Sequence, residues 1–414
     1  MEKNLKKLKA SVGHSDNIDD AIKDALKDVK NPNIVITFFS SKFDPYKVYS
    51  KIKSYVDKNT EIVGASTAGE ISSKTDCRVN TISIMAIESP YINIGIGVGE
   101  NLSKDIKRAT KQSVVNATKS LDKNKRMTII NILQRAYIKK SLHELLRTKF
   151  FINMLLLDGL VGQEENYLRN LSLHIPKETT VIGGSAGDDF KFEKTYLIGN
   201  GVYTDAVVLT MINTFLKVGT AIGHPYYPTK KGALVTKAKG RVVYELNNKP
   251  AADVLKELLK TDRISTEVFA RYTTGIKSID IFGEYMIKSP MHETENGGVV
   301  FHAEIPEGSF LTVMETDEEY LIEKFKKTLL DAVKDAGLPK KLGAIIIFNC
   351  ALRYLLKCHY GVNDLFFIKN IIGEDIPVIG FNTYGEQGRT LGGSLGHYNQ
   401  TSNVLVVADE LVDE

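Results

Sequence analysis

The sequence has few of the residues that support disulfide or metal chemistry. Its 414 residues include 3 cysteines, Cys77, Cys350 and Cys358, and no C-x-x-C pair. A sparse, odd cysteine count predicts reduced thiols rather than a disulfide framework. None of the 8 histidines belongs to an H-x-x-H or H-E-x-x-H pair. We therefore expect no metal site.

Long hydrophobic runs are also lacking. Purely apolar segments such as residues 343–348 have the length of a strand, well below the roughly 20 residues that a membrane-spanning helix needs. Residues 1–10 mix lysine with leucine and contain no apolar core of the kind found in signal peptides. These patterns predict a cytoplasmic protein that does not insert into a membrane.

Charge of one sign is not in marked excess. The 54 Lys and Arg and the 50 Asp and Glu give a formal net charge of +4, and opposite charges are interspersed along the chain. This balance does not suggest a nucleic-acid partner. The hydrophobic content of 43% is ordinary for a globular protein. The length predicts about two or three domains.

One glycine-containing motif occurs three times. It consists of two β-branched residues, a glycine, a small or polar run, a second glycine and a carboxylate. The copies read IVGASTAGE at residues 62–70, VIGGSAGD at residues 181–188, which is one residue shorter, and VIGFNTYGE at residues 378–386. A short apolar run that ends in glycine predicts a buried strand entering a tight turn.

The sequence around each copy predicts a strand, helix and strand in succession. Earlier apolar runs lie at residues 34–39, 127–133 and 343–350, and helix-like sequence separates them from the copies. Such βαβ units have parallel strands and right-handed crossovers. Residues 81–98 and 206–223 each predict a strand, turn and strand. We therefore expect an α/β fold of mixed, largely parallel sheets, built from repeated βαβ units with appended antiparallel hairpins.

Further signals predict helices and a domain boundary. Helical patterns cover residues 15–29, 104–121, 135–156, 250–259 and 316–335, and strands are expected near residues 298–303, 309–314 and 404–407. The segment HPYYP at residues 224–228 carries two prolines and favours an extended connector. We place the boundary there, giving domains 1–223 and 224–414.

Candidate ligand-binding residues lie in and around the glycine turns. Backbone N–H groups in such turns can bind anions, although no copy matches a nucleotide-binding motif. Each turn taken alone is more typical of a structural role than of a functional one. Arg353 follows the strand at residues 343–350 and suits either a ligand carboxylate or a salt bridge. With Tyr384 and Glu386 it would offer opposed charges to a zwitterion. The full set is Ser66, Thr67, Gly183, Gly184, Ser185, Asp188, Asn349, Cys350, Arg353, Gly380, Tyr384, Gly385, Glu386 and His397.

Together these motifs resemble those of the FIST sensory family, the F-box and intracellular signal transduction proteins. The first half is similar to the family's N-terminal domain at residues 64–70, 158–160 and 183–188. The second half is similar to its C-terminal domain at residues 250–251, 349–353, 380–386 and 397–401. The resemblance spans nearly the whole chain. It implies a ligand-sensing module of signal transduction that binds small molecules such as amino acids.

The resemblance also implies a partner. Modules of this family are often joined to kinase, cyclase or chemotaxis output domains, and we expect no room for one in 414 residues. A separate signalling partner, such as a histidine kinase or a chemotaxis protein, would then receive the signal. Some relatives resemble haem-based nitric-oxide sensors. This sequence has no C-x-x-C-H motif and no obvious axial histidine, which leaves only non-covalent haem open.

The sequence thus leaves three hypotheses. The first is a sensor without enzyme activity or cofactor, which binds an amino acid or another small carboxylate near Arg353, Tyr384 and Glu386. The second is a haem-binding nitric-oxide sensor. The third is an enzyme that uses Cys350 as nucleophile, with His359 as the nearest candidate base. Alternatively, Cys350 is a small side chain that only fills space in the buried core.

Overall fold

The computed structural model describes residues 6–123, 151–177, 179–278, 283–373, 376–389 and 395–412, and it contains three similar units. In each unit the sheet order is first strand, last strand, second strand, third strand, and the second and third strands are parallel. We call the three units together the central body. The first unit contains β1 (Lys9–Ser15), α1 (Ile18–Ala25), β2 (Ile34–Ser40), α2 (Pro45–Tyr55), β3 (Glu61–Thr67), β4 (Glu70–Ser72), β5 (Thr75–Arg78) and β6 (Ile82–Glu88).

The other two units repeat this order. The second contains β7 (Ile92–Glu100), α3 (Ile106–Lys123), β8 (Phe151–Leu157), α6 (Glu164–Leu171), β9 (Thr180–Ser185), β10 (Leu197–Gly199), β11 (Val202–Tyr203) and β12 (Ala206–Thr214). The third begins with β13 (Leu216–Gly223) and continues with α9 (Glu318–Asp335), β22 (Leu342–Cys350), α10 (Ala351–Tyr360), α11 (Asp364–Ile372), β23 (Val378–Thr383), β24 (Glu386–Arg389), β25 (Leu395–Tyr398) and β26 (Ser402–Leu411).

The units exchange strands in a cycle. The β10–β11 pair of the second unit joins the sheet of the first through β3, and the β24–β25 pair of the third joins the second through β9. The β4–β5 pair of the first unit joins the third through β23. Within the described residues each of these sheets therefore has six strands drawn from two units. No unit completes its sheet with its own strands.

The structure is mixed α/β, as expected, but three details of the prediction are wrong. The sheets are largely antiparallel, because each described sheet of the central body contains a single parallel pair. The segments 81–98 and 206–223 are not hairpins, since β6 and β7, like β12 and β13, belong to different sheets. Residues 151–157 form β8 rather than the end of a helix. The strand expected at residues 127–133 lies outside the described residues.

The first glycine of each motif is required by the parallel pair. Gly64, Gly183 and Gly380 lie opposite residues 37, 155 and 347 of the preceding strand. A Cβ at these glycines would lie 2.2, 2.2 and 2.3 Å from the carbonyl oxygen of that neighbour. Any larger residue would separate the two strands. The second glycine has a backbone role in two copies, since Gly69 and Gly385 have φ of +123° and +157°.

Aromatic rings fill the centre where the three sheets meet. The Phe381 ring lies 4.4 Å from that of Phe38 and 5.7 Å from that of Phe348, measured between centroids, and all three side chains are buried. Gly184 occupies the position in its copy that Phe381 has in the third. A Cβ there would lie 3.3 Å from Phe381 Cζ and 2.9 Å from Phe348 Cδ1. The small residue in one copy thus makes room for the large one in another.

Several helices begin at polar caps that the sequence supplies. Asn17 accepts hydrogen bonds from the first turn of α1, and Asp44 does the same for α2, where Pro45 occupies the first helical position. Asp317 caps α9, and Gly337 follows its end with φ of +79°. Pro250 precedes α7 (Ala251–Leu259) as its N-cap.

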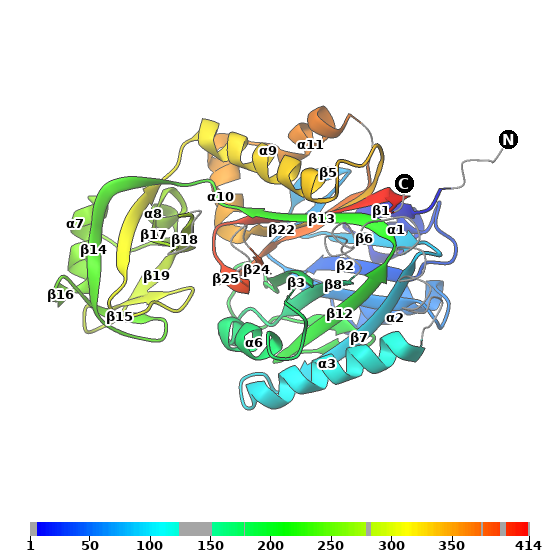
Figure 1. The fold of residues 1–414 in the computed structure, drawn as a ribbon, viewed down its shortest axis with the longest axis horizontal. Coiled ribbons are helices and arrows are strands. Elements are labelled where there is room, and N and C mark those ends of the chain that lie inside the picture. The colour runs from blue at the N-terminus through cyan, green and yellow to red at the C-terminus, as the bar shows by residue number, and fades with distance from the viewer. Residues whose placement is uncertain are drawn as a thin grey trace.

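An insertion at residues 227–315 interrupts the third unit between β13 and α9. Its described strands form one eight-stranded sheet, a lobe beside the central body in Figure 1. The predicted boundary at residue 224 falls where this insertion begins, while β13 before it pairs with β26 near the C-terminus. The insertion contains β14 (Tyr227–Lys239), β15 (Val242–Leu246), β16 (Lys249–Pro250), α7, α8 (Thr266–Arg271), β17 (Tyr272–Lys277), β18 (Tyr285–Lys288), β19 (Pro290–Glu293), β20 (Val299–Phe301) and β21 (Phe310–Glu315).

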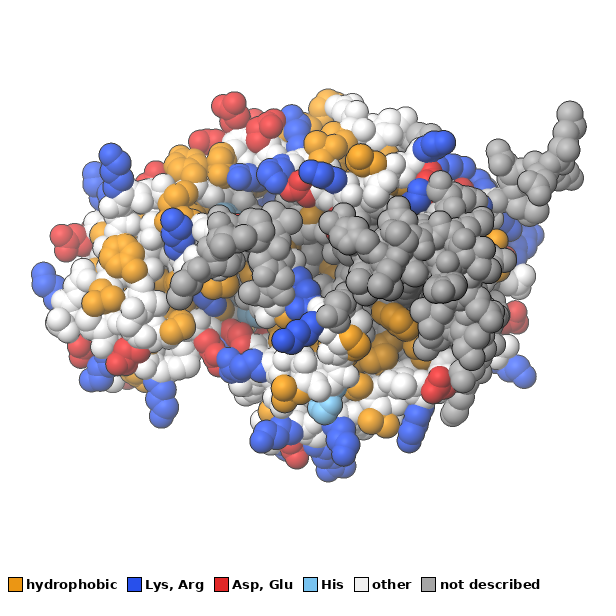
Figure 2. Space-filling model, viewed as in Figure 1, with side chains coloured by type: hydrophobic (Ala, Val, Ile, Leu, Met, Phe, Trp, Pro, Cys, Tyr) orange, Lys and Arg blue, Asp and Glu red, His pale blue; other side chains and the backbone are white. Residues whose placement is uncertain are grey.

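Two features of the described residues concern membranes and surface charge. None of the described helices combines the length and the apolar character needed to cross a bilayer. Figure 2 shows Lys and Arg side chains intermixed with Asp and Glu over the described part of the viewed face. This distribution agrees with the small net charge of the sequence.

The central aromatic cluster makes a first prediction. Phe381→Ala removes a buried ring at the junction of three sheets, so we expect the free energy of unfolding to fall by about 3 to 5 kcal/mol in urea denaturation. Phe366→Ala is the control, because that ring is 58% exposed, and we expect it to cost less than about 1 kcal/mol. Equal losses for the two variants would show that the cluster does not join the units.

Candidate functional site

The three glycine turns form backbone hydrogen bonds with one another inside the protein. The turn of one motif exchanges backbone hydrogen bonds with the strand end of the next motif around the cycle. Most N–H groups that a bound anion would need are therefore used inside the protein. The bonds run from Ala68 N to Asn382 O (3.0 Å), Asn382 N to Gly69 O (2.8 Å), Gly187 N to Ser66 O (3.0 Å), Tyr384 N to Ser185 O (3.0 Å) and Ser185 N to Gly385 O (2.8 Å).

The structure buries nearly all the residues that the sequence singled out. Tyr384 is partly exposed, and its hydroxyl donates to Asp188 Oδ1 at 2.7 Å. The others are buried around the three turns and the end of β22. Their role in ligand binding stays a prediction. They are Ser66, Thr67, Gly183, Gly184, Ser185, Asp188, Asn349, Cys350, Arg353, Gly380, Gly385, Glu386 and His397.

Glu386 sits in a hydrogen-bonded cluster of two threonines. Its Oε2 accepts from Thr401 N at 3.1 Å and from Thr401 Oγ1 at 2.6 Å, and its Oε1 contacts Thr383 Oγ1. The first motif repeats the arrangement, with Glu70 between Thr67 and Thr81. Burial raises the pKa of each glutamate to about 8. A pKa of about 8 favours the protonated, uncharged form of both side chains at neutral pH.

Arg353 belongs to a buried ion-pair cluster. Its Nη1 and Nη2 donate to Asp364 at 2.6 and 3.1 Å, and Nη1 also donates to Asn349 Oδ1 at 2.7 Å. Lys357 lies 2.8 Å from both Asp364 and Asp76. Burial alone would raise the pKa of Asp364, but the two cations outweigh it and lower that pKa to about 2. A ligand carboxylate at Arg353 would have to displace Asp364.

Cys350 and His359 are not placed as a nucleophile and its base. Cys350 is buried at the end of β22, and burial, followed by the charge of Glu386, raises the pKa of its thiol above the ordinary value. His359 is exposed and packs against the Tyr360 ring. His359 lies nine positions after Cys350 in the sequence, a separation of about 13 Å along the axis of α10.

Partly buried ionic contacts join the central body to the insertion. Arg241 of the insertion donates to Glu164 at 2.7 Å and to Glu165 at 2.6 Å, and Glu165 also accepts from Glu304 N at 2.9 Å. The glutamate pair occupies the first turn of α6. Arg241 stands in no motif, and its role could not be found from the sequence.

His397 lies beside these contacts. Its Nδ1 is 3.1 Å from Gln387 Nε2, which donates, so the imidazole proton is on Nε2. Burial lowers the pKa of His397 below its ordinary value. The ring packs on the backbone of Gly385, where a Cβ would lie 2.1 Å from His397 Cε1. Gly385 is therefore required for this histidine to be buried.

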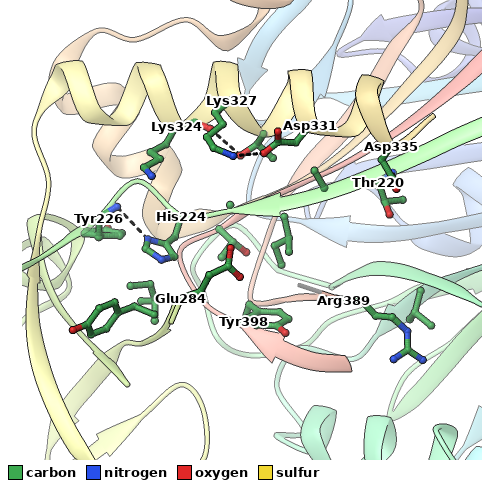
Figure 3. A pocket seen from close by; sticks show the side chains of 18 of the residues that line it. Thr220, His224, Tyr226, Glu284, Lys324, Lys327, Asp331, Asp335, Arg389 and Tyr398 are labelled. Atoms are coloured by element: carbon green, nitrogen blue, oxygen red, sulfur yellow. Dashed lines mark hydrogen bonds and ion pairs between the residues drawn. The ribbon is translucent and has the colours of Figure 1, made fainter. Parts of the chain in front are cut away.

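A cavity of about 490 Å³ lies between the central body and the insertion (Figure 3). Its walls come from β9, β13, α9, β24 and β25 of the body and from β18 and the start of the insertion. None of the fourteen candidate residues lines it. The side chains labelled in Figure 3 are Thr220, His224, Tyr226, Glu284, Lys324, Lys327, Asp331, Asp335, Arg389 and Tyr398.

Lys324 lines the cavity, and no ion pair to its ammonium is found among the described residues. Its Nζ lies 4.8 Å from the centroid of the Tyr320 ring. On the same helix, Lys326 and Lys327 pair with Glu323 and Asp331 at 3.0 and 2.5 Å. Burial, and then the charge of Lys324, lowers the pKa of His224 to about 4, so His224 is neutral at pH 7.

The cavity contacts the third glycine motif through Thr401. This residue lines the cavity, and its hydroxyl donates a hydrogen bond to Glu386 Oε2 at 2.6 Å. Thr180 and Val181, at the start of the second motif's strand, line the cavity as well. The lining comes from segments between residues 179 and 401, so no local pattern in the sequence could have identified it. The nearest signal was the proline-containing segment at residues 224–228.

These features define a mixed α/β protein with a cavity of the size that small-molecule sites have. Comparison with known families identifies the FIST N domain at residues 33–249 and the FIST C domain at residues 251–389. The chain belongs to the FIST family, whose domains are associated with signal-transduction sensing.

Two further comparisons give weaker similarities. The chain is 28% identical over 321 residues to "Uncharacterized protein MJ1623" of Methanocaldococcus jannaschii. The aligned region covers 73% of this chain and 57% of that protein. The chain therefore spans a little over half the length of this relative. The crystal structure of a cyanuric acid hydrolase from A. caulinodans aligns with 97% of this chain and 99% of its own at a TM-score of 0.34 and 7% identity. A similarity this low supports no argument.

The buried glutamates predict a pH-dependent stability. The folded protein binds the proton of Glu386 more tightly than the unfolded chain, because burial raises this pKa from 4.5 to about 8. The resulting stability is complete below about pH 4.5 and is lost as pH rises through about 8. We expect the free energy of unfolding of the unchanged protein to fall between about pH 5 and pH 8. In Glu386→Gln this decrease should be smaller by about 2 to 4 kcal/mol. Urea denaturation at both pH values measures this.

The control for this experiment is Glu257→Gln at an exposed position of α7. It should keep the pH dependence of the unchanged protein. Parallel curves for the unchanged protein and Glu386→Gln would show that Glu386 is ionised in the folded state at every pH tested.

The contacts of Arg241 predict a second effect on stability. Arg241→Ala leaves Glu164 and Glu165 without this cation, and the arginine is 24% exposed. We expect a loss of about 2 to 3 kcal/mol in the free energy of unfolding. Arg169→Ala breaks the pair with Glu304, in which the arginine is 59% exposed, and should cost less than about 1 kcal/mol. If the two variants unfold alike, Arg241 does not hold the insertion to the body.

Proposed function

We propose that this chain is a cytoplasmic sensory protein that binds an amino acid or another small carboxylate in the cavity beside Lys324. The observation that carries the proposal is the placement of Lys324. It is half-buried, it lines a cavity of about 490 Å³, and its ammonium has no carboxylate partner among the described residues. A partly desolvated ammonium gains most from a partner that brings its own negative charge.

The opposite wall supports a zwitterionic ligand. In Figure 3, Lys324 projects from α9 toward the cavity, and Glu284 of the insertion projects into it from the other side. This arrangement suits a carboxylate at one end of a ligand and an ammonium at the other. Opposed charges were expected from Arg353 and Glu386, and the cavity offers them from different residues. Tyr226, Tyr285 and Tyr398 add apolar surface between the two ends.

The position of the cavity supports a signalling role. A ligand there would contact both the central body and the insertion, so its affinity would depend on how the two are arranged. A ligand shifts a conformational equilibrium only through such a difference in affinity. We propose that the altered arrangement is recognised by a separate partner, such as a histidine kinase or a chemotaxis protein.

The two alternative functions have less support. An enzyme using Cys350 would need a thiolate, whereas burial raises the pKa of this thiol, and His359 is too distant to act as its base. A haem sensor would need an axial ligand. His397 is held by Gln387 and packs on Gly385, and the charged groups of Glu164, Glu165 and Arg241 surround it. These residues do not fit a bound haem.

The proposal predicts the behaviour of Lys324→Ala. A thermal-shift screen against amino acids and other small carboxylates should identify a stabilising compound, because a ligand at about a hundred times its dissociation constant stabilises by about 2.7 kcal/mol. Lys324→Ala should weaken binding of that compound at least about tenfold by calorimetric titration, since it removes the cation facing the carboxylate. Lys326→Ala, which lies on the same helix and pairs with Glu323, should bind as the unchanged protein does.

Two results would contradict this. A ligand that binds Lys324→Ala with unchanged affinity would lie elsewhere in the molecule. A screen in which no amino acid or carboxylate stabilises the protein would remove the proposed ligand class.

A further inference from the structure

We propose that a groove on the sheet of the insertion binds an acidic, extended segment of a partner protein. The groove, of about 520 Å³, lies where β14, β17, β18 and β21 are neighbours. This surface is separate from the cavity at Lys324, although the side chain of Tyr285 contributes to both. The inference does not depend on which small ligand the cavity binds.

The groove has charge of one sign. Lys230, Lys231 and Lys277 line it, all three are exposed, and none of its lining residues is acidic. Lys231 Nζ is 3.4 Å from the carbonyl oxygen of Leu258, and no ion pair to these lysines is found among the described residues. On α9, by contrast, Lys326 and Lys327 each have a carboxylate oxygen within 3.0 Å of the ammonium nitrogen. The excess positive charge of the groove is therefore available to an anionic partner.

The backbone explains why the lysines gather there. The pairing of β14 with β21 is regular from Gly232 to Leu234 and shifts register between Pro228 and Gly232. Lys230 and Lys231 lie in this irregular segment, so both side chains leave the strand where its alternation is interrupted. Lys277 comes from the end of β17, across β21. Three lysines from two strands thus surround one short groove.

Exposed apolar side chains adjoin these lysines. Phe310 is 55% exposed and Leu234, its cross-strand neighbour, is 43% exposed. The Phe310 ring lies over Gly232, where a Cβ would be 2.4 Å from Phe310 Cε1. Glycine at 232 therefore allows the ring to lie flat on the sheet and stay exposed. A partner that presents carboxylates around one apolar side chain matches this surface.

A peptide fits the observations better than a nucleic acid. Nucleic-acid sites need basic groups that follow the phosphates over an extended surface. Here the lysines are confined to a groove of about 520 Å³, and both signs of charge are mixed over the described surface in Figure 2. A small contact of this kind is typical of transient signalling encounters.

The test uses fluorescence anisotropy on the whole chain with three labelled probes. The first is a synthetic peptide of about twelve residues, rich in glutamate around a central leucine. The second is the same peptide with glutamine in place of glutamate, and the third is a uridine oligonucleotide of similar length. We expect the acidic peptide to bind and to be weakened by raising salt from about 50 to about 300 mM, because salt screens the lysines.

Matched variants locate the binding site. Replacement of Lys230, Lys231 and Lys277 by glutamate should weaken binding of the acidic peptide at least about tenfold. Replacement of the exposed Lys107, Lys111 and Lys119 of α3 by glutamate changes the net charge equally and should leave binding within about twofold. Phe310→Ser should weaken binding of the leucine-containing peptide about threefold or more. It should not change the binding of a peptide with glycine in place of leucine. If the first triple variant does not fold, the double variant Lys230→Gln with Lys277→Gln replaces it. This double variant should bind the acidic peptide at least about threefold more weakly than the unchanged protein.

Three outcomes would overturn the proposal. The acidic peptide could fail to bind the unchanged protein. It could be weakened equally by both triple variants, which would show an effect of net charge alone. The oligonucleotide could bind more tightly than the peptide and lose affinity in the groove variant, which would assign the groove to a nucleic acid.

Discussion

The exchange of hydrogen bonds among the three glycine turns is the constraint on which the rest of the central body depends. Each turn follows one parallel strand and bonds to the strand end of the next motif in the cycle. Each sheet is completed by strands that follow the turn of another unit along the chain. A single unit would expose an unpaired sheet edge, which is prone to pair with strands of other chains. Packing between the units therefore accounts for the repetition of the motif.

The units differ most where the molecule has its cavity. The first and third motifs each bury a glutamate between two threonines, whereas the second places Asp188 against the backbone N–H groups of residues 192–194. Only the third unit carries the insertion. Thr401 then serves two roles, as a partner of Glu386 and as part of the cavity wall. A change at the cavity therefore acts on the same cluster that holds the third turn.

Local patterns predicted the glycine strands, their turns and several capped helices, because these depend on neighbours in sequence. They did not predict which strand pairs with which. The segment 81–98 has the composition of a hairpin, yet β6 and β7 enter different sheets, and only long-range packing decides between the two. The same limit applies to the site. Arg353 was recognised as an arginine at a strand end, but its partner Asp364 and the isolated Lys324 follow from the positions of α11 and α9.

The connection between the insertion and α9 determines how a ligand in the cavity could produce a signal. The last strand of the insertion, β21, ends at Glu315, and α9 begins at Glu318, so little chain is available to absorb a movement between them. Helix α9 also packs on β13 and β26 of the central body. A displacement of the insertion would therefore be passed to α9, which supplies Lys324. Since the groove lysines lie on strands of the same insertion, a ligand that fixes its position would also fix the orientation of that groove relative to the central body.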